Sequence, residues 1–260
     1  MLYSSSFLLM SAANFFTVCS IGAFFLFPLF ILDHGGSKAD IGILMGAFAL
    51  SSVLCRPWIS ALTDRIGRKR SYTIGCAIMT SLPLTSLSFQ GDISSFYLPL
   101  LLFRIIHGVG LAFCFTSAFT YIADIVPQER LNEGIGMFGV TGISALAVGP
   151  FVAEIIIREF GFFSFFLGAA GLGGMGLLLQ LPLRESFSQA AEESSQSFLS
   201  VLTRRRTLTA ALLAVLFGFG LSASGSFVSP FAKEKAVAFI SLYFLCYSSA
   251  AVTTRLLGGR

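Results

Sequence analysis

The feature that most constrains this chain is a series of long apolar stretches separated by short polar connections. Lipid offers the backbone no hydrogen-bond partner, so such stretches must form helices or a closed barrel. Their length and the lack of alternation between apolar and polar residues exclude a barrel. The sequence therefore predicts an all-α membrane protein with about eight transmembrane helices of about 20 residues each. The eight stretches are 7–32, 39–62, 72–89, 96–123, 134–157, 162–181, 208–231 and 236–254.

Composition supports the same fold class and argues against a metal site and a nucleic-acid partner. Charged residues make up 12% of the chain and hydrophobic residues 55%, whereas soluble domains carry about 25% charged residues. The five cysteines lie inside apolar stretches without ligand-like spacing, and only two histidines are present, so no metal site is expected. The net charge of +4 comes from short basic loops, and we expect no nucleic-acid partner.

The basic residues predict the orientation of the chain. If the N-terminus is cytoplasmic, the cytoplasmic loops hold nine Lys and Arg residues, and the opposite side holds four, namely Lys38, Arg158, Lys233 and Lys235. This excess agrees with the positive-inside rule. We therefore expect a multi-pass protein of the plasma (inner) membrane with a cytoplasmic N-terminus, in contact with the lipid bilayer.

One long polar stretch separates the first six apolar stretches from the last two. Residues 184–207 are rich in Ser, Gln and Glu and end in three arginines, which is typical of a cytoplasmic connector. We expect three parts: a six-helix bundle at 1–183, a linker at 184–207, and the first two helices of a second bundle at 208–260.

The loop after the second stretch carries an ordered motif. It reads Ser60-Ala-Leu-Thr-Asp-Arg-Ile-Gly-Arg-Lys-Arg70. This resembles the signature loop of the major facilitator superfamily, G-x-L-x-D-R-x-G-R-R/K, at Asp64, Arg65, Gly67, Arg68 and Lys69. A generic basic loop would explain the charges but not their order. The resemblance implies a transporter fold with twelve helices, of which about eight are present, and a cytoplasmic latch at this cluster.

Two further segments resemble the same superfamily. Arg104 and His107, followed by two glycines, fit its R-x-x-Q/H-G-x-G segment, and residues 123–130 fit its D-x-x-P-x-x-x-R/E loop. Arg104 lies about 13 Å into its helix at 1.5 Å per residue, and an arginine at this depth is costly unless it is paired or faces water. The resemblance implies a role in proton coupling or conformational exchange for Arg104 and His107. A structural arginine and a packing histidine are the alternatives.

The fifth stretch resembles the glycine-proline signature of drug and metabolite antiporters. Gly149 and Pro150 match its core, and a proline at such a place kinks a helix, so a bend is expected. Glycines of the signature are replaced by Ala145, Ala153 and Glu154. This departure weakens the assignment to antiporters specifically.

Polar side chains within the apolar stretches are candidate cavity residues. They are Asn14, which shares a helix face with Thr17 and Ser20, Arg56 in the second stretch, and Glu154 near the outer end of the fifth. The Asn14 face could equally serve helix packing, and Glu154 could instead reach toward Arg158 at the interface.

The end of the chain repeats an earlier segment. Arg255 lies 199 residues after Arg56, and Gly259 then aligns with Ser60, as expected for two related halves. A complete second copy would need an aspartate four residues after Gly259, so we expect the chain to continue beyond Arg260.

These observations predict a secondary transporter that works by alternating access. The favoured hypothesis is proton-coupled efflux of small amphipathic molecules or metabolites, driven by the proton gradient without a bound cofactor, by a monomer. The alternatives are a proton-coupled importer of sugar or organic acid, and a nonfunctional truncated fragment. A membrane enzyme is disfavoured because the apolar stretches hold too few ionisable residues to assemble a catalytic group. We therefore predict no enzymatic activity.

Overall fold

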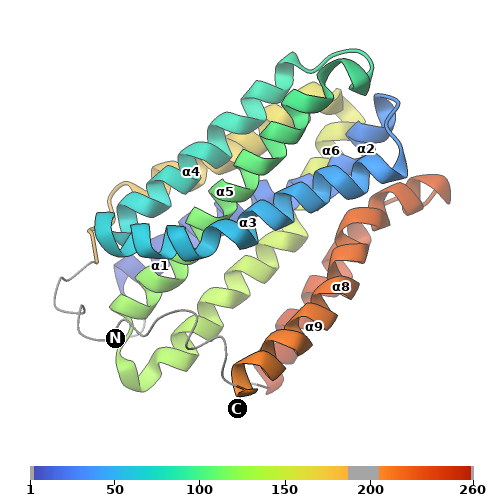
Figure 1. Ribbon diagram of the computed structural model, residues 1–260. Helices are drawn as coiled ribbons and strands as arrows, with labels where there is room; N and C mark the ends of the chain where they lie inside the picture. Colours follow the sequence, from blue (N-terminus) through green and yellow to red (C-terminus); the bar gives the residue numbers. More distant parts are fainter. Residues whose placement is uncertain (1–2, 187–204, 259–260) are drawn as a thin grey trace.

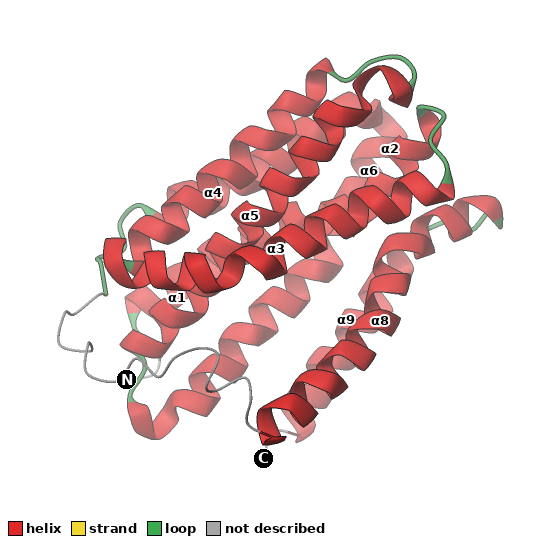
Figure 2. Cartoon of the chain, in the orientation of Figure 1, coloured by secondary structure: helices red, strands yellow, loops and turns green. Residues whose placement is uncertain are grey.

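The computed structural model describes residues 3–186 and 205–258 of the chain (Figure 1). Figure 2 shows that the regular structure in these two ranges is helical throughout. Most of the expected linker, 187–204, lies outside the described residues. The elements are α1 (Ser5–Ala23), η1 (Phe24–Leu26), α2 (Phe27–Asp33), α3 (Lys38–Ile66), α4 (Arg68–Thr85), η2 (Ser86–Ser88), α5 (Ile93–Ile125), η3 (Gln128–Arg130), α6 (Leu131–Gln180), α8 (Arg205–Glu234) and α9 (Ser241–Gly258).

The predicted count of about eight transmembrane helices is not confirmed. Among the described residues, five segments are long and apolar enough to cross a membrane: Ser5–Asp33, Lys38–Ile66, Ile93–Ile125, Gln128–Gln180 and Thr207–Glu234. The difference of three has three sources. The α4 helix begins with three consecutive basic residues, two of the predicted stretches are merged in the single element α6, and the 18-residue α9, which contains Arg255, is not among the five segments.

The α6 helix is interrupted at one glycine. Its 50 residues would extend about 75 Å at 1.5 Å per residue, more than twice the thickness of a bilayer core. Gly161 has φ 74° and ψ −176°, a backbone conformation that is open essentially to glycine alone. The element therefore consists of two helical parts that meet at Gly161, between the predicted stretches 134–157 and 162–181.

The α1 helix is the centre of the packing, and α8 is at its edge. In the most apolar 18 residues of the α1 to α2 segment, 78% of the residues are buried. In the most apolar 18 residues of α8, none are buried. Large apolar side chains of α8 are exposed instead, as expected for a surface in contact with lipid. They include Leu212, Leu213, Leu216, Phe217 and Phe219.

Two glycines allow helices to approach closely. A Cβ atom at Gly108 of α5 would overlap the Phe48 carbonyl oxygen and the Ser51 hydroxyl of α3, and one at Gly149 of α6 would overlap the Cys19 carbonyl oxygen of α1. Small residues at such crossings permit the dispersion contacts that hold membrane helices together.

The α8 and α9 helices form a hairpin beside α2, α3 and α6 (Figure 1). The buried Ser229 of α8 donates a hydrogen bond of 2.9 Å to the Phe25 carbonyl oxygen. The ring of Phe25 stacks on Phe244 of α9 with centroids 5.0 Å apart. The hairpin thus packs on the other helices through aromatic and hydroxyl side chains.

Candidate functional site

The two ends of the helix bundle carry different polar groups. The end that holds Asp64, Gly67 and Asp124 is called the signature-loop end below. The opposite end, which holds Glu154 of α6 and the turn between α8 and α9, is called the far end. The membrane-embedded interior between them contains Arg104 and a series of cavities.

At the signature-loop end, Gly67 joins α3 directly to α4. Its φ of 102° lies in the left-handed region, where a residue with a Cβ atom is strained. A Cβ atom there would also lie only 2.5 Å from a carboxylate oxygen of Glu185. Both observations explain why a glycine occupies this place in the predicted motif.

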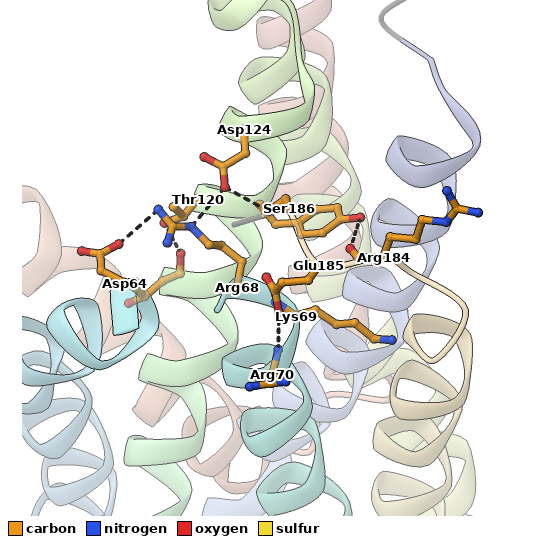
Figure 3. A network of polar contacts seen from close by, with 11 residues as sticks. Asp64, Arg68, Lys69, Arg70, Thr120, Asp124, Arg184, Glu185 and Ser186 are labelled. Carbon is orange, nitrogen blue, oxygen red and sulfur yellow. Dashed lines mark hydrogen bonds and ion pairs between the residues drawn. The ribbon is translucent and has the colours of Figure 1, made fainter. Parts of the chain in front are cut away.

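Arg68 links three helices at this end (Figure 3). Its guanidinium lies 3.2 Å from the Asp64 carboxylate of α3 and 3.0 Å from the Asp124 carboxylate of α5. Arg68 is only 8% exposed, and charge-assisted contacts of this kind strengthen as water is excluded. The predicted cluster therefore assembles around Arg68, with Asp124 from the loop that was predicted beside it.

Glu185 is a member of this network that sequence reasoning missed. Its carboxylate accepts hydrogen bonds from the backbone N–H groups of Lys69 at 3.1 Å and Arg70 at 3.3 Å, and so caps the positive end of the α4 dipole. The Lys69 ammonium donates to the Leu181 carbonyl oxygen at 2.8 Å. Arg65, another member of the predicted motif, is exposed on α3.

Arg104 lies in the interior without an acidic partner among the described residues. It is fully buried. Its guanidinium donates to the Leu44 carbonyl oxygen at 3.2 Å and to the Met45 sulfur at 3.3 Å. The Cζ atom also lies 4.4 Å from the centre of the Phe48 ring and 5.1 Å from that of Phe27, within range of cation–π attraction.

His107 completes this aromatic enclosure. Its Nδ1 atom lies 3.3 Å from an Nη atom of Arg104, and its ring lies 4.6 Å from Phe24 and 5.1 Å from Phe48 by centroid distance. The Nε2 atom is buried with no hydrogen-bond partner in the described part of the chain. The structure thus brings the two predicted residues together, and their roles in coupling stay predictions.

A cavity of about 470 Å³ lies between the α8–α9 hairpin and the other helices. Its size suits a drug-sized ligand. The lining is almost wholly apolar and aromatic, with hydroxyl groups on the hairpin side. The aromatic residues are Phe25, Phe48, Tyr243, Phe244 and Tyr247, and the hydroxyl residues include Ser222, Ser226 and Ser248.

Two further cavities lead from this one toward the signature-loop end. The second, of about 380 Å³, shares Ile143 and Leu146 with the first and is lined by Asn14 and Arg255. The third, of about 990 Å³, shares Arg255 with the second and is lined by charged residues of the segment between α5 and α6. Polarity therefore rises along the series toward that end.

The other predicted polar residues lie elsewhere. Thr17 accepts a hydrogen bond from the Tyr72 hydroxyl at 3.2 Å, and Ser20 donates to the Ala169 carbonyl oxygen at 2.8 Å, so both serve helix packing. Arg56 is exposed on α3 and lines none of the three cavities. Gly149 and Pro150 are buried against α1, within a part of α6 whose dihedrals are helical, and the predicted bend there stays a prediction.

Glu154 is placed at the far end and not in the cavities. It is 4% exposed, and one carboxylate oxygen lies 2.9 Å from the Arg158 guanidinium, as one of the two predicted alternatives had it. The same carboxylate accepts the backbone N–H groups of Ile240 at 2.9 Å and Ser241 at 2.7 Å. A side chain of α6 therefore caps the N-terminus of α9.

Other contacts close the far end around Glu154. Arg158 donates a hydrogen bond to the Ala238 carbonyl oxygen, and its Cζ atom lies 4.4 Å from the centre of the Phe239 ring. Lys38 of α3 forms an exposed ion pair of 3.0 Å with Glu234 of α8. The far end is thus tied together by charged groups, while the cavities lie toward the other end.

The capping contacts of Glu185 and Glu154 were not predicted for the same reason, although Glu154 itself was a candidate residue. Glu185 and Glu154 each bind the N-terminus of a helix that is distant in the sequence, and spacing within one helix gives no sign of such a contact. The available signal was an acidic residue just after an apolar stretch for Glu185 and one inside the end of a stretch for Glu154.

Comparisons with known proteins agree with the motifs. The family model of the Major Facilitator Superfamily matches residues 7–260. Quinolone resistance protein NorA of Staphylococcus aureus (strain Mu50) is 26% identical over 217 residues, which cover 80% of this chain and 53% of the relative. Multidrug resistance protein 2 of Bacillus subtilis (strain 168) is 27% identical over 217 residues, with the same coverage. The chain spans about half the length of the curated relatives it matches.

The family match covers nearly the whole chain, and the apolar helices agree with a multi-pass membrane protein. The family is one of transporters and not of enzymes. The Asp64 to Lys69 loop, the Arg104 segment and the helical architecture all fall within the matched range. The chain belongs to the Major Facilitator Superfamily.

Proposed function

We propose that the chain is part of a secondary transporter that expels small amphipathic molecules from the cell in exchange for protons. The names of its relatives concern resistance to quinolones and to multiple drugs, which favours efflux over uptake. In this proposal the proton gradient supplies the energy, no cofactor takes part, and the working unit is a monomer.

The observation that carries this proposal is the aromatic cavity between the hairpin and the other helices. An amphipathic ligand would bury its apolar surface against Phe25, Phe244 and Tyr247 and satisfy its few polar atoms with serine hydroxyls. A sugar would need many directed hydrogen bonds, and the lining offers few. The cavity therefore supports an amphipathic substrate over a sugar.

The arrangement of the two ends supports one stage of alternating access. The far end is closed by charged contacts, and the series of cavities extends to the signature-loop end. We propose that the signature-loop end is cytoplasmic in the plasma membrane, as is the N-terminus. The observed arrangement would then be one that accepts substrate from the inside.

The number of membrane crossings is also part of the proposal. The α1–α2 segment, α3, α4, α5, the two parts of α6 that meet at Gly161, α8 and α9 would cross the bilayer eight times. Six crossings before the linker 184–207 and two after it would give the N-terminal bundle and the start of a second one.

The test is an efflux assay in bacteria that lack their own drug pumps. Cells that express the protein should accumulate less ethidium and less of a fluoroquinolone than cells without it, and a protonophore should abolish the difference. Phe244→Ala, which removes a cavity ring, should raise accumulation, whereas Phe217→Ala on the lipid-facing side of α8 should not. Equal accumulation with and without the protein would refute the proposal.

A further inference from the structure

Glu154 joins two parts of the chain at a place where water from the far side of the membrane would arrive first. Its carboxylate, on α6, accepts both backbone N–H groups at the start of α9 and pairs with Arg158. The same residue is 4% exposed, so its charge is held in place by these contacts and not by solvent.

We propose that Glu154 is a proton-binding site that controls the closure of the far end. When it is charged, it holds the N-terminus of α9 against α6. When a proton adds to one carboxylate oxygen, that oxygen becomes an O–H donor, and two N–H groups are left to share a single acceptor. The negative partner of Arg158 is lost in the same step, so the α8–α9 turn is released. No bond other than the new O–H bond forms or breaks.

The closure depends on this group more than on its neighbours. The Lys38–Glu234 pair also spans the far end, but its side chains are 71% and 57% exposed, and ion pairs in water contribute little. Ionisable residues near this end, from α2, α3, the turn before α5, α6, α8 and the turn after α8, are Asp33, His34, Lys38, Asp40, Asp92, Arg158, Glu159, Lys233, Glu234 and Lys235. Of these, only Arg158 is in hydrogen-bond or ion-pair contact with Glu154 among the described residues.

This inference rests on the proposed function for its purpose. In an exchanger, a proton taken up from outside would open the far end and release the substrate. The opening itself can nevertheless be measured without any substrate. Failure of the proton site and failure of the efflux proposal are therefore separate results.

The experiment measures a distance across the far end by electron paramagnetic resonance. Spin labels are attached at Gln90→Cys, in the turn before α5, and at Lys235→Cys, after α8, both exposed, with the five native cysteines replaced. The protein is held in lipid nanodiscs at about pH 7.5 and about pH 4, because a glutamate carboxyl ordinarily takes up a proton only near about pH 4.3. We expect a longer distance population to grow at the lower pH.

Substitutions identify the group that responds. Glu154→Gln should raise the ratio of long to short distances about tenfold or more at the higher pH, the effect of losing one or two charge-assisted hydrogen bonds, and should remove the response to pH. Glu154→Asp, which keeps a carboxylate, should restore the response in part. Glu159→Gln removes the same charge five residues along α6 from an exposed position and should behave as the unmodified protein does.

His34 needs its own control because imidazole also titrates in this range. Its Nδ1 atom lies 2.9 Å from the Phe30 carbonyl oxygen. The proposal expects His34→Gln to keep the pH response. The proposal is overturned if the distances do not change with pH, if Glu159→Gln or His34→Gln removes the response, or if Glu154→Gln keeps it.

Discussion

Arg68 and Arg104 are both buried arginines, but the molecule satisfies them by different means. Arg68 lies between the carboxylates of Asp64 and Asp124 at the signature-loop end. Arg104 has a carbonyl oxygen, a sulfur, an imidazole and aromatic rings around it. Neutral acceptors compensate a buried charge less well than a carboxylate does, so Arg104 is the costlier of the two to keep.

The energetic cost of burying the Arg104 charge leads to a prediction about stability and transport. Arg104→Met keeps similar volume and removes the buried charge, so thermal unfolding in detergent should be unchanged or shifted upward, by the equivalent of about 1–4 kcal/mol. Efflux in the ethidium assay should fall about tenfold or more if the residue couples transport, as its segment implies. Arg56→Met, on the exposed side of α3, is the matched control for both. A stability loss of about 3 kcal/mol would instead assign Arg104 to structure alone.

Gly67 provides a second prediction at the residue scale. Gly67→Ala should lower the free energy of unfolding by about 1–2 kcal/mol for the positive φ, and by more because the new methyl group meets Glu185. Gly91→Ala has a similar φ of +85° but open space around it, so it should show the backbone cost alone. The two losses are compared by chemical denaturation, and a loss at Gly67 no larger than at Gly91 would contradict the contact with Glu185.

Close helix packing requires a small residue at some glycine positions but not at others. Gly108 lies against the backbone of α3, whereas Gly171, in the second part of α6, has no atom near its Cβ position. Gly108→Ala should therefore destabilise the protein by about 1–3 kcal/mol, and Gly171→Ala should stabilise it by about 0.5–1 kcal/mol. Thermal unfolding of the two variants checks both signs, and equal effects would show that α3 and α5 do not pack so closely.

The helical elements could be predicted from the sequence because lipid enforces them. Hydropathy alone placed α3, α5 and α8 within a few residues of the observed bounds. Hydropathy placed the start of the last stretch at residue 236, whereas α9 begins at Ser241. The carboxylate of Glu154, on another helix, caps α9 at that point. Hydropathy did separate the stretches 134–157 and 162–181, between which Gly161 interrupts α6, but it could not show which residue carries the break, since that depends on dihedral angles.

The candidate site was predictable to the extent that it is local. The order of charges from Asp64 to Lys69 and the Arg104–His107 spacing lie in continuous segments, and Asp64 contacts Arg68 while Arg104 contacts His107. The Phe48 ring over Arg104, and Glu185 at the start of α4, come from distant segments. No periodicity in a single sequence indicates those neighbours.

At the scale of the whole molecule, the polarity is reversed relative to a soluble protein. Arg104, His107 and Glu154 are buried, and large apolar side chains of α8 are exposed. The proposed orientation predicts that Lys235→Cys, in a background without native cysteines, reacts with a membrane-impermeant maleimide in intact cells. Arg70→Cys, at the signature-loop end, should react only after the cells are permeabilised. The reverse pattern would invert the proposed topology.

If the chain acts in efflux as proposed, the aromatic lining of the cavity between the hairpin and the other helices has a consequence for which drugs can evade it. A molecule held by contact with rings such as Phe25, Phe244 and Tyr247 can settle in several poses, because dispersion forces have little directionality. Loss of one ring then reweights the poses and does not abolish them. A drug that evades the proposed pump would therefore have to differ in bulk or charge, since moving a single hydrogen-bonding group would leave most of its poses intact.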